Sequence, residues 1–449
     1  WWKTTPTDSH FTVYGGGEVN VSGIEYVAYL FASDAGGFGD DGSENIIKCG
    51  SYTGSNGSGK EINLGFEPQW VLVKNTSRAG QNWVIVDNMR QFDNTGYGWL
   101  YPNSSAAEAS GTGSVYASPT ATGFKTYGNN AAFDYLTDSY IYIAIRRPMK
   151  TPESGTEVFQ SLAYTGDGAS TRNFDLDLTL DAYFQACRSS STYDFKNLTA
   201  RLTGKGLYTA GTGAEFATNT SLDVQDGLRA IGFENTLNQS GETYIINGFK
   251  RATGFFDVVC HTQVGTGTTN ILPHNLNATP ELIISKTRSS ADSWYVWCVY
   301  NTQILTGSGI ALNSNTATRQ TSGNAWFNIN SSSFSTILPY TNGVTNISYL
   351  FATLAGVSKV GSVAHSGTTN VDCGFSAGAR FVLVKRIDST GDWYVWDSVR
   401  GIVSGNDPYL LLNSTAAEVT NTDYIDPLSS GFTLTSSFTA GTYIFLAIA

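Results

Sequence analysis

The sequence predicts an all-β protein built from tandem antiparallel β-sandwich-like domains of about 100 residues each. Short apolar segments alternate with turns rich in Gly, Asn and Ser along the whole chain. Aromatic residues make up 13% of the sequence, with 24 Tyr and 24 Phe, and such residues favour strands. The same landmarks also recur several times in the same order. Apolar residues at helical spacing are hard to find, so helices are not expected.

Two neighbouring strands are the clearest repeated landmarks. The first ends in a positive charge, at Trp70–Lys74, Phe184–Arg188, Leu282–Lys286 and Phe381–Lys385. The second is aromatic and follows a few residues later, at Trp83–Asp87, Trp294–Cys298 and Trp393–Asp397, with a degenerate form at Tyr193–Asn197. A loop containing Asn-Ser and Ala-Glu and a Gly-Phe strand come next, before a closing strand.

The closing strands set the period of the repeat. They begin at Tyr26, Tyr140, Tyr244, Asn346 and Tyr443, so successive spacings are 114, 104, 102 and 97 residues. Length differences of this size belong in loops, which tolerate insertions. We therefore predict repeat 1 over residues 45–147, a degenerate repeat 2 over 157–252, repeat 3 over 256–355 and repeat 4 over 358–449.

Residues 1–33 match only the C-terminal strands of a partial repeat. Phe11–Gly15 parallels Phe124–Gly128, and Tyr26 opens a closing strand. Two strands cannot bury a core alone. We therefore expect this segment to be completed by preceding chain or by another subunit.

The aromatic strand carries apolar side chains on both faces. In Trp83–Asp87, the side chains of Trp83 and Ile85 point to one face, and those of Val84 and Val86 point to the other. A strand buried on both faces normally lies in the middle of its sheet. The pattern therefore predicts a central position for this strand.

Composition excludes several classes of partner. The formal net charge of −11 argues against nucleic acid, whose binding needs clustered Lys and Arg. No apolar run approaches the length that spans a bilayer, so membrane insertion is not expected. The four His and five Cys show no metal-ligand spacing, and the Gly-x-Gly stretches precede strands rather than helices. We expect no metal and no cofactor.

The carboxylates that could support catalysis recur with the repeat instead of forming one constellation. Asp87 and Asp397 end the aromatic strand, while Glu108, Glu215 and Glu418 share a loop position. Their counterparts in repeat 3, Cys298 and Thr318, could not perform acid–base chemistry. We therefore predict no enzymatic activity and a structural role, such as pairing of the strand-end Asp with Arg90 or Arg400.

Repeated basic and aromatic residues indicate interfaces. Lys74, Lys286 and Lys385, with Arg188 in repeat 2, are interpreted as surface or interface charges. Tyr394 and Trp396 replace valines of repeat 1 and are the candidate surface-binding aromatics, because aromatic faces stack on sugar rings. The alternative is that these rings fill cores or seal the junctions between repeats.

Several longer motifs carry a family resemblance. They are Gly65–Lys74, the Trp-x-x-x-Asp-x-x-Arg pattern of Trp83–Arg90 and Trp393–Arg400, the Leu-x-x-Asn-Ser-x-x-Ala-Glu loop, and Tyr140–Lys150. With these motifs the chain resembles an uncharacterised tandem-repeat domain of virion structural and tail-fibre proteins of marine bacteriophages, especially phages of cyanobacteria. The match is tight in repeats 1 and 4 and weak in repeat 2.

This resemblance implies a location in the virus particle. It implies a phage structural protein, foremost a tail fibre or appendage that contacts other virion proteins and attaches to the host surface. A host-surface glycan is one candidate partner. A capsid decoration protein is the alternative. A polysaccharide-degrading tail spike is disfavoured because it needs an acidic pair in a unique cleft.

Self-association is also expected. Open sandwiches have unpaired edge strands, and Lys and Arg number only 26 in 449 residues, so few charges discourage edge pairing. A closed symmetric oligomer would turn such surfaces into interfaces. The resemblance to phage fibres favours a homotrimer.

Overall fold

A computed structural model describes most of the chain. The described residues are 4–449 except 16–17, 40–41, 43, 58, 91, 93–97, 111–115, 148, 193–195, 223, 225, 232–234, 301–307, 318 and 321–325. Tyr193–Phe195 of the predicted degenerate strand and Thr318 therefore lie outside the described residues.

The described chain is a series of antiparallel sheets, which confirms the predicted all-β class. Repeat 1 contains β1 (Ile47–Thr53), β2 (Glu61–Asn63), β3 (Pro68–Asn75), β4 (Trp83–Asp87), β5 (Gly98–Trp99), β6 (Ala109–Ser110), β7 (Ala117–Thr120), β8 (Gly123–Thr126) and β9 (Ser139–Arg146). A single 3₁₀ turn at Asn88–Arg90 follows β4.

The other repeats have the following elements. Repeat 2 contains β10 (Phe159–Thr165), β11 (Arg172–Phe174), β12 (Ala182–Cys187), β13 (Asn197–Ala200), β14 (Lys205–Tyr208), β15 (Phe216–Ala217), β16 (Thr220–Ser221), β17 (Leu228–Ala230), the short helix α1 (Asn235–Asn238) and β18 (Thr243–Phe249), after a 3₁₀ turn at Gly155–Glu157. Repeat 3 contains β19 (Phe256–Thr262), β20 (Asn270–Pro273), β21 (Leu282–Thr287), β22 (Trp294–Cys298), β23 (Ser308–Gly309), β24 (Arg319–Gln320), β25 (Trp326–Phe327), β26 (Ser333–Thr336) and β27 (Thr345–Phe351). Repeat 4 contains β28 (Ser358–His365), β29 (Thr369–Asp372), β30 (Phe381–Arg386), β31 (Trp393–Asp397), β32 (Leu410–Leu411), β33 (Ile425–Leu428), β34 (Gly431–Leu434) and β35 (Gly441–Ile448).

One two-sheet topology recurs in all four repeats. The larger sheet, here called the inner sheet, has the order β1-β9-β3-β4, and the same order returns as β10-β18-β12-β13, β19-β27-β21-β22 and β28-β35-β30-β31. The smaller, outer sheet is β2-β8-β7, β11-β17-β16, β20-β26-β25 or β29-β34-β33. The repeated sandwich architecture predicted from the landmarks is therefore present in the described residues.

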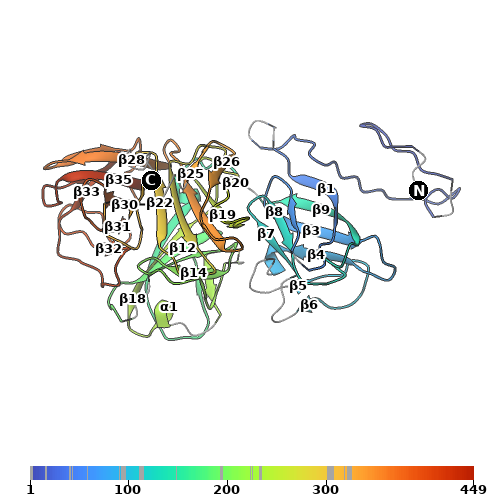
Figure 1. Ribbon diagram of the computed structural model, residues 1–449, viewed down its shortest axis with the longest axis horizontal. Coiled ribbons are helices and arrows are strands. Elements are labelled where there is room, and N and C mark those ends of the chain that lie inside the picture. The colour runs from blue at the N-terminus through green and yellow to red at the C-terminus, as the bar shows by residue number, and fades with distance from the viewer. Residues whose placement is uncertain are drawn as a thin grey trace.

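Repeats 2, 3 and 4 close into one body, here called the ring. Their inner sheets turn one face to a shared core, where Phe249 of repeat 2 contacts Phe256 of repeat 3 and Phe381 of repeat 4, with ring centroids 5.7 and 5.8 Å apart. Phe159 and Phe381 also lie 5.2 Å apart. An apolar cavity of about 50 Å³ lies where the three sheets meet. Figure 1 shows these repeats as one compact body and repeat 1 beside it.

Repeat 1 has a core of its own. The inward face of its inner sheet, with Val71, Val73 and Tyr142, packs against Phe124 of the outer sheet. The same division between inner and outer sheet holds in repeat 4, where Val382 and Val384 pack against Phe432. Each repeat is thus a sandwich, and the ring adds a second burial layer on the other face of the inner sheet.

The expected central position of the aromatic strand holds in repeats 2 and 4, where β13 and β31 pair with a further strand, β14 or β32, but it is wrong for repeats 1 and 3. In repeats 1 and 3 it is the edge strand of the inner sheet, β4 or β22. In repeat 3 one face of β22 packs within the sandwich, while the other face reaches the interface between repeats. In repeat 3, burial on two faces therefore comes from packing between repeats and not from a central position.

The predicted strands in residues 1–33 are absent from the described part of this segment. The described residues among 4–33 belong to no strand, and Val27, Tyr29 and Leu30 are 80, 83 and 70% exposed. Figure 1 shows the segment running away from repeat 1. Val13 makes one isolated bridge and Ser33 bonds to Cys49 of β1, and completion of the segment by other residues stays a prediction.

Candidate functional site

Equivalent residues of the repeats are identified by strand pairing. Lys74 pairs with Ile141, Lys286 with Ile347, and Lys385 with Ile444 in the closing strand. In repeat 2 the pairing partner at this position is Ala186, opposite Ile245. Arg188 thus lies two residues beyond the lysine position, which corrects its predicted equivalence to the lysines.

The lysines of this position hold the ring together. Lys286 Nζ donates to the carbonyl of Thr212 in repeat 2 at 3.2 Å, and Lys385 Nζ donates to the carbonyl of Asn315 in repeat 3 at 3.2 Å. Both lysines are fully buried, and burial lowers the pKa of each to about 8. They therefore lie at the interfaces between repeats, which is one of the two positions, surface or interface, that the sequence predicted for them.

Repeat 2 makes the same contact from the facing strand. Lys196 lies immediately before β13 and donates through Nζ to the carbonyls of Ser414 and Ala416 in repeat 4, at 2.9 and 2.8 Å. In repeat 2 the lysine thus stands beside β13 instead of in β12, and it makes the same kind of contact with the neighbouring repeat. The three interfaces, 3 to 2, 4 to 3 and 2 to 4, are therefore cyclically equivalent.

The tryptophans that open the aromatic strand add a second contact. The indole of Trp294 donates to the carbonyl of Tyr208 at 2.9 Å, and the indole of Trp393 donates to the carbonyl of Ala311 at 2.9 Å. Trp294 and Trp393 are 0 and 1% exposed. These aromatics seal the junctions between repeats, which was the structural alternative for the surplus of aromatic residues.

Ion pairs complete two of the three interfaces. Arg288 pairs with Glu215 at 2.7 Å, and Arg188 pairs with Glu418 at 2.9 Å. In both cases the glutamate amide also donates to the carbonyl of the same arginine, at 2.8 and 2.9 Å. In repeat 4 the arginine position is occupied by Ile387, whose amide bonds to Thr442 just as that of Arg288 bonds to Thr345.

The repeated carboxylates have the structural role predicted for them. Asp87 pairs with Arg90, and Asp397 pairs with Arg400 at 2.6 Å, each three residues apart. Arg400 also reaches Glu418 at 3.2 Å, so that glutamate carboxylate accepts from one arginine of its own repeat and one of the neighbour.

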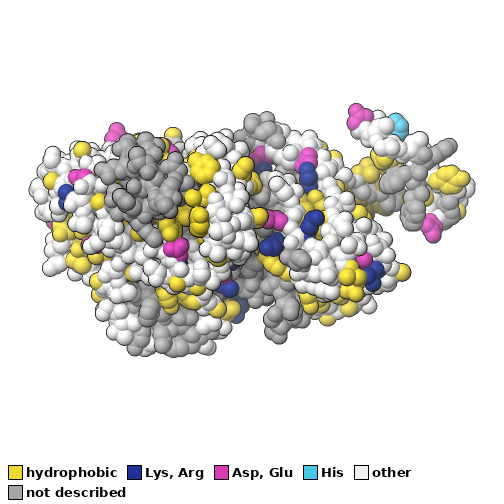
Figure 2. Space-filling model, in the orientation of Figure 1, with side chains coloured by type: hydrophobic (Ala, Val, Ile, Leu, Met, Phe, Trp, Pro, Cys, Tyr) yellow, Lys and Arg dark blue, Asp and Glu magenta, His cyan; other side chains and the backbone are white. Residues whose placement is uncertain are grey.

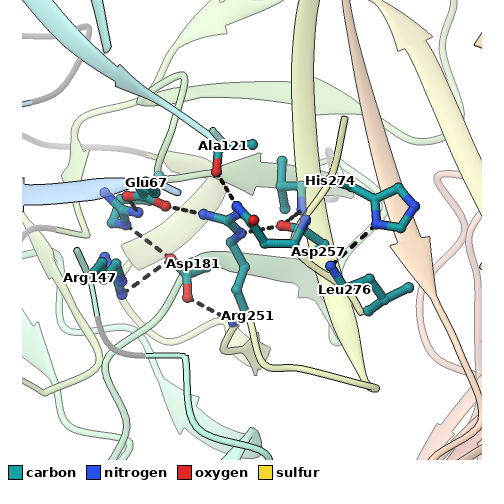
Figure 3. A network of polar contacts seen from close by, with 11 residues as sticks. Glu67, Ala121, Arg147, Asp181, Arg251, Asp257, His274 and Leu276 are labelled. Atoms are coloured by element: carbon teal, nitrogen blue, oxygen red, sulfur yellow. Dashed lines mark hydrogen bonds and ion pairs between the residues drawn. The ribbon is translucent and has the colours of Figure 1, made fainter. Parts of the chain in front are cut away.

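A buried ionic cluster joins repeat 1 to the ring. This junction cluster consists of Glu67, Arg147, Asp181, Arg201, Arg251 and Asp257 (Figure 3). Glu67 of repeat 1 accepts from both Arg201 and Arg251 of repeat 2, and Arg147 of repeat 1 pairs with Asp181 at 3.2 Å. All six residues are no more than 6% exposed, and three positive charges balance three negative ones.

The charges of the cluster shift the pKa values of their neighbours. Burial alone would raise the pKa of Asp181, but Arg147 and Arg201 lower it. Burial works against the charge of Arg251 as well, yet Asp257 and Glu67 raise its pKa. Burial and the neighbouring Arg201 lower the pKa of Arg147. Removing any one carboxylate would leave a buried arginine uncompensated.

Sequence reasoning missed the junction cluster. Its members come from two repeats and the start of a third, and apart from Arg251 and Asp257 the paired residues lie at least 20 residues apart in sequence. The usable signal was rarity, because only 14% of residues are charged and Glu67 and Asp181 each stand directly before an apolar strand.

The predicted surface aromatics are not free surface rings. Trp396 is 0% exposed and stacks with Tyr394 at a centroid distance of 5.5 Å, which overturns its assignment to the surface. Tyr394 is half-buried and contacts Tyr409 and Phe438 as well. Both side chains fill the sandwich of repeat 4 because the valine-to-aromatic replacements point to its inside face.

The described residues contain no cluster of His, Cys, Asp and Glu suited to a metal ion. Among them there is also no helix of the length and hydropathy needed to cross a membrane.

The fold and contacts define a tandem β-sandwich protein in which three repeats close a ring and a fourth is docked beside it. The chain belongs to the family described as a domain of unknown function, DUF7483, whose sequence model matches residues 1–148 and 154–449. No curated protein matches the chain. The second match spans all three repeats of the ring.

Proposed function

We propose that the protein is a structural component of a bacteriophage particle, an appendage or tail fibre with a role in attachment to the host surface. The observation that carries the proposal is the junction cluster, which fixes repeat 1 against the ring through six buried charges. A spacer needs such rigid joints between successive domains, because a flexible joint would not hold an adhesin away from the particle.

The resemblance to virion proteins supports the same function. The motifs Trp83–Arg90 and Trp393–Arg400 that carry it form the aromatic strand and the Asp–Arg pair after it. These residues shape sandwiches and interfaces, which fits a mechanical role. In this proposal the ring supplies within one chain the threefold packing that fibres obtain from three chains.

Imaging of labelled virions tests the proposal. An antibody against the ring, applied to purified particles that contain the protein, should label the tail or its appendages. Label spread over the head would instead support a capsid decoration protein, and particles without label would overturn both. Incubation with host-surface polysaccharide should release no new reducing ends, whereas release would favour a degrading tail spike.

A further inference from the structure

Repeat 1 presents the face that the other repeats bury in the ring. In its inner sheet, Leu72 lies between Ile143 and Ile85, as Leu383 lies between Leu446 and Val395 in repeat 4. Leu383, Leu446 and Val395 are 5, 2 and 0% exposed, whereas their three counterparts in repeat 1 are only half-buried. Nearby, Ile141 is 42% exposed. On the view of Figure 2, hydrophobic side chains reach the surface of repeat 1 between charged ones.

The polar groups of this face also lack their partners between repeats. Lys74 Nζ donates to the carbonyls of Asn75 and Gln81 at 2.7 and 3.0 Å, both within repeat 1. The lysines of the ring make such local bonds too, but each adds one to a neighbouring repeat. The indole of Trp83 has no hydrogen-bond partner among the described residues, although Trp83 pairs with Lys74 just as Trp393 pairs with Lys385.

The loop that would accept these contacts is equally open. Glu108, the counterpart of Glu418, is 47% exposed, and within the described part of the chain its only ion pair is with Arg90 of its own repeat. Residues 102–108 are all exposed. Repeat 1 therefore has both sides of the ring interface, the donor side at Lys74 and Trp83 and the acceptor side at the loop, and neither is occupied.

We propose that repeat 1 is one third of a second ring, and that its partner is a tandem pair of sandwich domains of this family of the kinds represented by repeats 2 and 3. The family match supports this, because the sequence model that spans the whole ring also matches residues 1–148. In the ring, the equivalent apolar sheet face of each repeat is covered by the two other repeats.

The charges select this partner over two further copies of repeat 1. Within the ring, the loop glutamate faces an arginine on the neighbouring repeat, as Glu418 faces Arg188. Repeat 1 keeps the glutamate, Glu108, but has Thr76 at the arginine position, just as repeat 4 has Glu418 and Ile387. Three copies of repeat 1 would place Glu108 against Thr76, whereas a domain like repeat 2 supplies the arginine.

A disulfide trap tests the assignment. The amide of Glu418 donates to the carbonyl of Arg188 at 2.9 Å, so these backbones are neighbours and their Cα atoms fall within the reach of a disulfide, about 7 Å. The pair Arg188→Cys and Glu418→Cys in the full chain is the positive control and should oxidise within one molecule.

The test protein replaces residues 1–44 with a second set of residues 154–355, so that repeat 1 follows repeats 2 and 3 as repeat 4 does. It carries Glu108→Cys together with Arg188→Cys in the added set. We expect this disulfide to form, and oxidation of Trp83 by hydroxyl radicals to fall about tenfold relative to the natural chain. A second version guards against a poorly folding join. It keeps the full chain and places residues 154–323 before residue 1, so that residues 1–33, which match the C-terminal strands of a repeat, complete the added copy of repeat 3.

Two results would overturn the proposal. One is a folded test protein, with its own ring intact, in which the Glu108→Cys thiol stays free and Trp83 stays reactive in both versions. The other is a natural chain that sediments as a symmetric trimer and that, with Thr76→Cys and Glu108→Cys, is cross-linked between chains. That second outcome would assign the face to three copies of repeat 1.

Discussion

Replacing Glu67 with Gln should release repeat 1 from the ring. The Glu67 side chain is 1% exposed and accepts from Arg201 and Arg251, whose side chains are 2 and 1% exposed. The variant leaves three buried arginines against two carboxylates. Breaking a buried ion pair by removing one partner costs about 3–5 kcal/mol.

This cost acts on docking more than on folding, because repeat 1 has its own core. Since about 1.4 kcal/mol changes an equilibrium tenfold, the docked population should fall at least a hundredfold relative to the undocked one. Small-angle scattering should then show a larger radius of gyration and a broader distance distribution. The matched control is Glu153→Gln, which removes an exposed pair with Lys150 and should leave the scattering curve unchanged.

An unchanged scattering curve for Glu67→Gln would refute the reasoning. It would mean that the ionic cluster does not hold the joint and that other contacts, such as the hydrogen bond from Asn275 to the carbonyl of Ala121, fix repeat 1 by themselves.

Three further predictions concern the ring. Trp393→Phe should lower the free energy of unfolding by about 1–3 kcal/mol, because it leaves the buried carbonyl of Ala311 unpaired. The equivalent Trp83→Phe should change it by less than about 0.5 kcal/mol. Equal effects of the two variants in urea titrations would contradict the ring. Glu418→Gln should cost about 2–3 kcal/mol because Arg188 and Arg400 both lose a charged acceptor, and the exposed Glu108→Gln should cost less than about 1 kcal/mol by the same assay. The ring should also gain stability between pH 8 and 9.5. In this range the buried Lys286 and Lys385, with pKa values of about 8, lose their protons in the folded state, whereas the same lysines stay protonated in the unfolded chain up to about pH 10.5. Each lysine then adds up to about 1.4 kcal/mol per pH unit. The double variant Lys286→Met/Lys385→Met should lose this rise of stability with pH. An unchanged dependence of stability on pH in the variant would contradict the lowered pKa values of the two buried lysines.

Local patterns were sufficient for the sandwiches. Strand alternation and repeated landmarks predicted the all-β class, and the spacing of Asp397 and Arg400 predicted their pairing, because these signals lie within a few residues of one another. The ring was not predictable in this way. Residues such as Phe249 and Phe381 look like ordinary strand residues, and nothing local separates a face that packs inside a sandwich from one that packs between repeats.

The same limit explains the errors at single positions. The aromatic strand was expected to be central because both its faces are apolar, yet in repeats 1 and 3 it ends the inner sheet. Trp396 looked like a surface ring because it replaces Val86, yet it points into the sandwich. Arg188 matched the lysines in a linear alignment, and only the pairing of Ala186 with Ile245 reveals the two-residue offset.

Repeats 2–4 close a ring, and repeat 1 stands outside it with the same face open. Hydroxyl-radical footprinting of the natural chain, read residue by residue by mass spectrometry, tests this most directly at the equivalent Trp83, Trp294 and Trp393. We predict rapid oxidation of Trp83 and protection of Trp294 and Trp393 until the protein unfolds. Equal oxidation of all three tryptophans in the folded protein would contradict the ring.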